Sequence, residues 1–194
     1  MAISTIDSTG LQSPLASQAL SSPTITGAVV SSMASSVITS GTAVASTSGT
    51  SIDFTGIPSW VKRITVMLNG MSTSGTSIPQ IQLGAGSVQT TGYEAEAAGF
   101  QAAALLVSSV YTTGFPLGGD NSAASLYSGN ITFCSFGSNT WIGSMSGGAN
   151  NGGSGRTFHG GGRVTLSGTL DRLRITTTNG TDTFDAGSIN IIYE

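Results

Sequence analysis

Charged side chains are scarce in this chain. Asp, Glu, Lys and Arg make up 8% of its 194 residues, against roughly 25% in ordinary globular proteins. The six basic residues are scattered and the net charge is −3, so the basic stripe that binds nucleic-acid phosphates is missing. A surface of Ser, Thr, Gly and Asn tolerates burial against a partner, because hydroxyls and amides can pair where single charges cannot. The composition therefore suggests a part of an obligate assembly that does not bind nucleic acid.

Cysteine and long apolar runs are lacking as well. The single cysteine, Cys134, excludes an intrachain disulfide framework and is compatible with synthesis in a reducing compartment. We expect it to be a packing residue, buried in a strand over 133–136. The longest apolar run, 102–107, is far shorter than the roughly 18 residues of a membrane helix, so no membrane insertion is expected. The first ten residues, MAISTIDSTG, also lack the basic and apolar regions of a signal peptide.

The residues of common catalytic and metal sites are missing too. The only histidine, His159, has no evident nucleophile to activate, and we interpret it as an exposed or subunit-contacting loop residue. Glu94 and Glu96 share one face of an extended segment, but no base lies near them in sequence. Asp182 and Asp185, in NGTDTFD, have calcium-type oxygen ligands, although an Asn-Gly turn before a strand-end aspartate explains them better. We therefore predict no enzymatic activity and no cofactor.

The clearest structural signal is the stretch 51–70, SIDFTGIPSWVKRITVMLNG. Its second half alternates apolar and polar residues with period 2, which is typical of a strand with one face in a core. The preceding Gly-Ile-Pro tripeptide requires a turn, since proline lacks an N–H and keeps the residue before it out of the helical region. That turn carries Trp60. The basic residues Lys62 and Arg63 are expected to pair with nearby acids such as Asp53, with a solvated strand edge as the alternative.

The rest of the chain predicts an all-β sandwich, because Gly and Asn punctuate short runs at the spacing of such folds. The alanine-rich segment 95–106 contains helix formers, but Gly99 and the β-branched residues after it favour a loop followed by a strand. A tight hairpin is expected around Gly49. A Gly- and Asn-rich loop is expected over 146–162, with at most a short strand at 157–158. The expected strands are 52–54, 63–68, 80–83, 124–127, 130–136, 140–145, 163–166, 170–177 and 188–193.

Residues 1–50 differ in character from the rest. They carry one charge, Asp7, and too little bulky apolar matter to form a core alone. A short helix packing against its own copies, an extended strand crossing onto a neighbour and a flexible tail all remain open. We therefore divide the chain into an attachment and oligomerisation arm, 1–50, of extended low-charge character, and an antiparallel, jelly-roll-like β-sandwich domain, 51–194.

Four segments resemble a known module. SGTSIDFTGIPSWVKRITVMLNGMSTSGTS (48–77), together with IQLGAG (81–86) and TTGY (90–93), resembles a module common in virion proteins of tailed bacteriophages, and LDRLRITTTNGTDTFDAGSINIIYE (170–194) is similar to its end. The resemblance covers roughly 36–194. It implies a homo-oligomer, most often a trimer, made in the bacterial cytoplasm and assembled into the virion without disulfides.

The function that this resemblance implies is that of a tail fibre or tail appendage. The arm would attach to other virion proteins while the β domain projects toward the host surface, and the family supplies no catalytic residues. A capsid decoration or cement protein is the alternative, and a carbohydrate-binding module is a third reading.

Five residues are candidates for contact with the host surface, where a glycan is the expected ligand. Trp60 and Trp141 are expected near strand ends, and their rings suit stacking on sugars, with core packing as the alternative. Arg156, Phe158 and His159 belong to the segment expected to be a loop. We expect that loop and one of the tryptophans to form an exposed tip.

Overall fold

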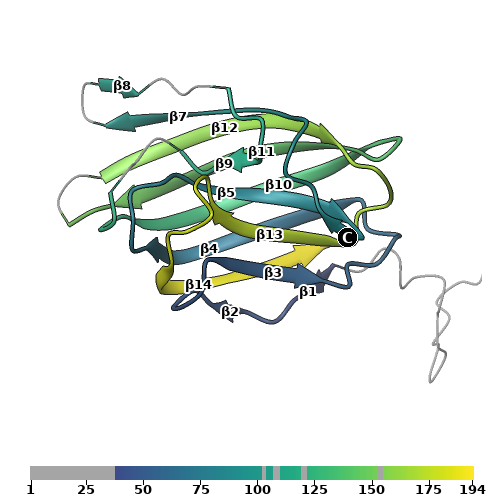
Figure 1. Ribbon diagram of the computed structural model, residues 1–194, viewed down its shortest axis with the longest axis horizontal. Helices are drawn as coiled ribbons and strands as arrows, with labels where there is room; N and C mark the ends of the chain where they lie inside the picture. The colour runs from purple at the N-terminus through teal and green to yellow at the C-terminus, as the bar shows by residue number, and fades with distance from the viewer. Residues whose placement is uncertain (1–37, 102–103, 107–109, 119–121, 153–154) are drawn as a thin grey trace, which may run out of the picture. The chain divides into compact units, whose positions relative to one another are not determined.

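The computed structural model describes residues 38–101, 104–106, 110–118, 122–152 and 155–194 (Figure 1). All of the described residues belong to one compact unit, Ser35–Glu194. Its described residues form fourteen β-strands and no helix. The predicted all-β class is confirmed, whereas the prediction for residues 1–37 of the arm lies outside the described residues.

The strands form two antiparallel sheets. Sheet A has nine strands in the order β1-β14-β4-β10-β11-β12-β7-β8, with β2 also paired to β14. Its strands are β1 (Thr39–Ser40), β2 (Val44–Ala45), β4 (Arg63–Thr73), β7 (Tyr93–Gln101), β8 (Ala104–Leu106), β10 (Leu126–Gly137), β11 (Thr140–Asn150), β12 (Gly155–Thr165) and β14 (Phe184–Tyr193). Sheet B has five strands in the order β3-β13-β5-β6, with β9 paired to β5. They are β3 (Ser51–Thr55), β5 (Pro79–Ala85), β6 (Ser87–Val88), β9 (Phe115–Pro116) and β13 (Arg172–Thr177).

The two sheets pack face to face and share one core. Figure 1 shows β3, β13 and β5 as a layer in front of the strands of sheet A. The chain crosses between the layers at most connections, for example from β3 to β4, from β4 to β5 and from β13 to β14, as in jelly rolls. The predicted antiparallel, jelly-roll-like sandwich is therefore confirmed.

The period-2 pattern of the opening stretch decides which face of β4 is buried. Ile64 and Val66 are fully buried and Leu68 nearly so, while Arg63 on the alternate parity is exposed. They pack with residues of both sheets, among them Phe133 of β10 and Ile81 of β5. Burying each such side chain contributes about 1.5–3 kcal/mol, so β4 is a central stabilising strand.

Tyr93 links the two sheets through its hydroxyl group. It lies on β7 of sheet A, yet its Oη accepts a hydrogen bond from the Leu83 backbone N–H of β5 at 2.8 Å. The same hydroxyl lies 3.0 Å from the Gln89 carbonyl oxygen, to which it donates. The ring meets Phe115 edge-on, with centroids 5.3 Å apart. Burial raises the pKa of this phenol, against a smaller lowering by the Leu83 hydrogen bond, so Tyr93 stays neutral. Its hydroxyl group connects the two sheets through these hydrogen bonds.

Two glycines make the bulges in which β4 and β14 change register. Gly70 and Gly187 have φ angles of 63° and 84°, a left-handed conformation that favours glycine. The two backbones also come close, since a Cβ on Gly187 would lie 2.3 Å from the Gly70 carbonyl oxygen. The bulges let both strands keep their apolar faces inward beyond the shift.

Several element predictions were wrong. The segment after residue 93 is not a loop followed by a strand, because strand β7 begins at Tyr93 itself. The expected loop over 146–162 is mostly two paired strands, with β11 extending to Asn150 and β12 beginning at Gly155. No hairpin forms around Gly49, since β2 pairs with β14 in sheet A and β3 with β13 in sheet B.

The sandwich also begins earlier than residue 51. Residues assigned to the arm pair with β14, with Thr39 opposite Tyr193 and Val44 opposite Ile189. Ser46 is fully buried, and its Oγ donates a hydrogen bond of 2.7 Å to the Ala186 carbonyl oxygen. The segment 38–50 is therefore part of the folded domain.

The strand registers place two ends of sheet A far apart. At one end, which we call the arm end, Thr39 and Ile64 both lie opposite Tyr193. At the other, the tip end, Leu126 lies opposite Asn150 just before the β11–β12 turn. At about 3.3 Å per residue, strands of 11 residues such as β4 and β11 span roughly 30 Å. The described chain thus begins at one end of the sandwich, and the β11–β12 turn lies at the opposite end (Figure 1).

Candidate binding surface on sheet A

The structure does not bring the five predicted contact residues together. Trp141 and Phe158 are buried core residues, 4% and 2% exposed, so their rings are not available at a surface. For Trp141, the alternative of core packing is therefore correct. Trp60 is partly buried at the arm end, where its ring packs 5.8 Å from that of Tyr193. Arg156 is partly buried and His159 is exposed, both on strand β12 and not in a loop. The expected tip formed by the 146–162 segment and a tryptophan is therefore wrong.

The exposed side of sheet A, facing away from sheet B, carries one of the remaining candidates, His159. The strand registers align its outward residues in rows across β11, β12 and β7. The first row consists of Ile142, Arg163 and Glu94, the second of Ser144, Gly161 and Glu96, and the third of Ser146, His159 and Ala98. Most side chains in these rows are small, polar or charged. We call the surface that the three rows form the outer face.

Glycines hollow out the middle of this face. A Cβ on Gly160 or Gly162 would lie 2.5 or 2.4 Å from a backbone carbonyl oxygen of β7, so the close approach of β12 and β7 requires glycine there. Gly161 lies between them and faces outward beside Ser144. Because it has no side chain, it forms the floor of an open trough of about 1010 Å³. Its walls include Glu96, Val110 and Ile142.

Charged groups at the rim are paired. Arg163 donates two hydrogen bonds of 3.0 Å to the carboxylate of Glu94. Both side chains are well exposed, so the pair contributes little stability. The His159 ring lies 6.0 Å from the ring of Phe100, which is 48% exposed. The trough therefore combines donors, acceptors and an apolar edge, and its described lining residues include no paired nucleophile and base.

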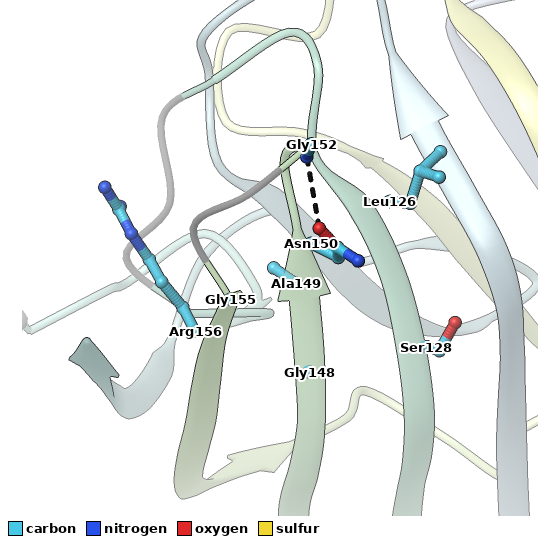
Figure 2. A pocket seen from close by; sticks show the side chains of 8 residues that line it. All are labelled: Leu126, Ser128, Gly148, Ala149, Asn150, Gly152, Gly155 and Arg156. Atoms are coloured by element: carbon cyan, nitrogen blue, oxygen red, sulfur yellow. Dashed lines mark hydrogen bonds between the residues drawn. The ribbon is translucent and has the colours of Figure 1, made fainter. Parts of the chain in front are cut away.

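A second hollow, of about 560 Å³, lies on sheet A at the tip end (Figure 2). Asn150 at its centre accepts a hydrogen bond of 3.1 Å from the Gly152 N–H through Oδ1, which shapes the turn. Figure 2 shows Leu126 and Ser128 on one side of this strand end, while the Arg156 side chain extends away on the other. Leu126 is 45% exposed, so the tip offers a small apolar contact beside an amide.

Other predicted residues are placed differently from expectation. Cys134 lies in strand β10 but is exposed, so the prediction of a buried thiol was wrong. Asp53 pairs with Arg174 across β3 and β13, at 2.7 and 2.9 Å, and not with Lys62 or Arg63. Arg63 instead pairs with Glu194.

The NGTDTFD segment is a turn, as the simpler interpretation held. The Asp182 carboxylate accepts hydrogen bonds from the Ser77 N–H at 2.9 Å and from the Asn179 side chain at 2.7 Å. These bonds lower its pKa. Asp185 follows in β14. Within the described ranges, no group of His, Cys, Asp and Glu side chains is arranged to hold a metal ion.

Sequence reasoning missed the trough, although a signal for it exists. The run YEAEAA at 93–98 alternates buried and exposed positions, and this period-2 pattern would have identified strand β7, on which the expected shared face of Glu94 and Glu96 lies. The three consecutive glycines of β12 gave no such signal, because glycine indicates neither strand nor face.

Comparison with protein-family models, with curated proteins and with solved structures finds no match for this chain. In the part of the chain that the structure describes, no helix is long and apolar enough to cross a membrane.

Proposed function

We propose that this chain is a bacteriophage virion structural protein, a tail fibre or tail appendage that attaches through its N-terminal arm and presents the β-sandwich to the host surface. The observation that carries the proposal is the pairing of the segments that resemble the virion module. The first of them supplies β3 and β4, the second β5, and the last β13 and β14. In the fold, β13 lies between β3 and β5, and β14 pairs with β4. Segments far apart in sequence thus form one structural module, which supports reading them as one resemblance.

The geometry of the sandwich suits such a role. The described chain begins at the arm end, and the β11–β12 turn lies at the opposite end. An arm fixed to the particle would therefore leave the tip end and the outer face of sheet A free to meet a host surface. Of the contact residues expected from sequence, His159 is exposed on that face and Arg156 lies at the tip-end hollow. No catalytic activity and no cofactor is part of the proposal.

The low charge of the chain supports an assembled state, and we propose a homotrimer whose arms join one another and other virion proteins. Analytical ultracentrifugation of the full chain tests this part. A mass three times that of the 19.4 kDa chain is the expected result, and a monomer at all concentrations would contradict it.

The location is tested on particles of the phage that encodes the chain. Antibody labelling in electron micrographs is expected to mark the tail, and particles lacking the chain are expected to adsorb poorly to host cells. Labelling over the whole head, with a copy number in the hundreds on a quantified gel, would replace the proposal with a capsid decoration protein. Absence of the chain from purified particles would overturn both.

A further inference from the structure

A third hollow lies on the exposed side of sheet B, on the other layer of the sandwich from the trough. It encloses about 320 Å³ over strands β13 and β5, between the segments around Thr113 and Asn179. That volume is near the lower end of the range for small-molecule sites. Its lining is almost wholly hydroxyl and amide side chains, with one guanidinium group.

Two buried glutamines form its floor. Gln80 and Gln82 on β5 are only 2% and 5% exposed, which is unusual for so polar a side chain. Both are held by Thr113: its hydroxyl donates to Gln80 Oε1 at 3.0 Å, and its carbonyl oxygen accepts from Gln82 Nε2 at 2.8 Å. The two amides are therefore fixed before any ligand arrives.

One of these amides has an unused acceptor. Gln82 makes a side-chain hydrogen bond through Nε2, but among the described residues no donor reaches its Oε1. Gln82 Oε1 is not among the buried side-chain atoms without a partner, so this acceptor is open to solvent at the wall of the hollow. Because Gln82 lines the hollow, a hydroxyl group entering it would supply a hydrogen bond to this oxygen.

The hollow also lacks net charge. Arg174 at its edge uses Nε and Nη2 to bind the Asp53 carboxylate, at 2.7 and 2.9 Å. That pairing neutralises the guanidinium while leaving N–H donors, since an arginine has five. The exposed hydroxyls of Thr90 and Thr178 complete the rim. Such a mixture of fixed donors and acceptors favours a neutral, hydroxyl-rich ligand over an anion or a cation.

We propose that this hollow binds one ring of a neutral saccharide, with Gln82 Oε1 accepting a hydrogen bond from a sugar hydroxyl. The argument depends on the hollow alone and holds whether or not the chain is a virion protein. In a tail appendage, the ring would belong to a glycan of the host surface; elsewhere, it would be a free sugar.

The test is a nuclear magnetic resonance titration of the full, 15N-labelled chain. The probes are the methyl glycosides of glucose, galactose, mannose and N-acetylglucosamine, with glucuronic acid as the charged counterpart. At least one neutral glycoside is expected to shift the side-chain amide signal of Gln82 saturably, and glucuronic acid is expected to shift it less. Maltohexaose in a parallel titration separates the two sources, since only an open hollow accepts a ring within a chain.

Variants localise the binding. Gln82→Leu is expected to weaken binding about tenfold, the effect of losing one hydrogen bond. Because this variant lacks the Gln82 side-chain amide, its binding is followed by the backbone amide signals of Thr113 and Thr178, which also line the hollow. Thr178→Trp, at an exposed position on the rim, fills the hollow without touching the core and is expected to abolish binding even if Gln82→Leu folds poorly. Ser144→Ala, on the outer face of sheet A, is the matched control and should change nothing. The proposal is overturned if no neutral glycoside shifts the Gln82 signal, or if Thr178→Trp binds as tightly as the parent chain.

Discussion

The hydroxyl of Tyr93 gives the sharpest prediction for a single atom. Tyr93→Phe removes the acceptor of the buried Leu83 N–H and keeps the ring in its place against Phe115. Leaving that donor unpaired is expected to lower the free energy of unfolding by about 1–3 kcal/mol, measured by urea denaturation. Tyr111→Phe is the control, since Tyr111 lies at the edge of β7, and a change of less than about 0.5 kcal/mol is expected there. Equal effects of the two variants would contradict a stabilising role of the Tyr93 hydroxyl between the two sheets.

Asp182 gives a prediction that depends on pH. Its hydrogen bonds to Asn179 and Ser77 lower its pKa in the folded chain. A lowered folded pKa means that the carboxylate stabilises the fold above its unfolded pKa of about 3.9, and that this contribution is lost as the pH falls through the folded value. Asp182→Ala is therefore expected to lower the free energy of unfolding by about 1 kcal/mol near neutral pH, and by less near pH 3.

The measurement is urea denaturation of both chains at the two pH values. Asp185→Ala is the matched control, because this neighbouring aspartate is exposed on β14. A loss for Asp182→Ala that is the same at both pH values would show that the carboxylate charge plays no part in the turn.

At the scale of elements, the paired bulges of β4 and β14 are the place where an added methyl group is expected to destabilise the fold most. Gly187→Ala puts a Cβ 2.3 Å from the Gly70 carbonyl oxygen at a φ of 84°. Backbone strain of about 1–3 kcal/mol is then added to a collision that requires one strand to move. Gly180→Ala is the control, since its φ of 68° is similar but nothing lies within 4 Å of its Cβ.

Thermal unfolding followed by circular dichroism distinguishes the two variants. Gly187→Ala is expected to lose several times more stability than Gly180→Ala. Similar losses for both would mean that β4 and β14 separate easily at the bulge and that the register shift does not depend on their close approach.

The same elements show how far sequence alone leads. Strand β4 was predictable because Ile64, Val66 and Leu68 alternate with polar residues over a long run. Strand β12 was not, since its glycines Gly160 and Gly162 are explained by β7, whose backbone lies where their Cβ atoms would be. In β11 likewise, a Cβ on Gly147 would lie 2.4 Å from the Phe158 ring. Such reasons are contacts between strands distant in sequence, and no local pattern contains them.

The candidate surface was predictable only in part, for a related reason. An aromatic side chain in a strand faces either the core or the exterior, and the parity depends on the partner strand. Trp141 and Phe158 face the core, while His159, next to Phe158, faces the exterior. The sequence therefore indicated that His159 is exposed, but it placed His159 in a loop and indicated neither strand β12 nor the trough that the glycines around it form.

At the scale of the whole sandwich, the main finding is that the folded domain begins before residue 51. The segment 38–50 covers the edge of β14 with backbone hydrogen bonds, of which Gly41 N–H to the Ile191 carbonyl oxygen is 2.7 Å and Ser46 N–H to Gly187 is 2.9 Å. An uncovered edge strand is a template for association with other chains. Residues 38–50, which the sequence analysis assigned to the arm, thus protect the edge of sheet A.

Two truncations separate these roles. The chain 35–194 keeps β1, β2 and the buried Ser46, so we expect cooperative unfolding with a midpoint close to that of the full chain. The chain 51–194 loses at least three hydrogen bonds to β14, at about 1 kcal/mol each, so we expect it to be about 3 kcal/mol less stable and to associate through the bare edge. Urea denaturation measures the first effect and light scattering the second. If 51–194 were as stable and as monodisperse as 35–194, β1 and β2 would be passive parts of the arm, and the domain boundary expected from sequence would be correct after all.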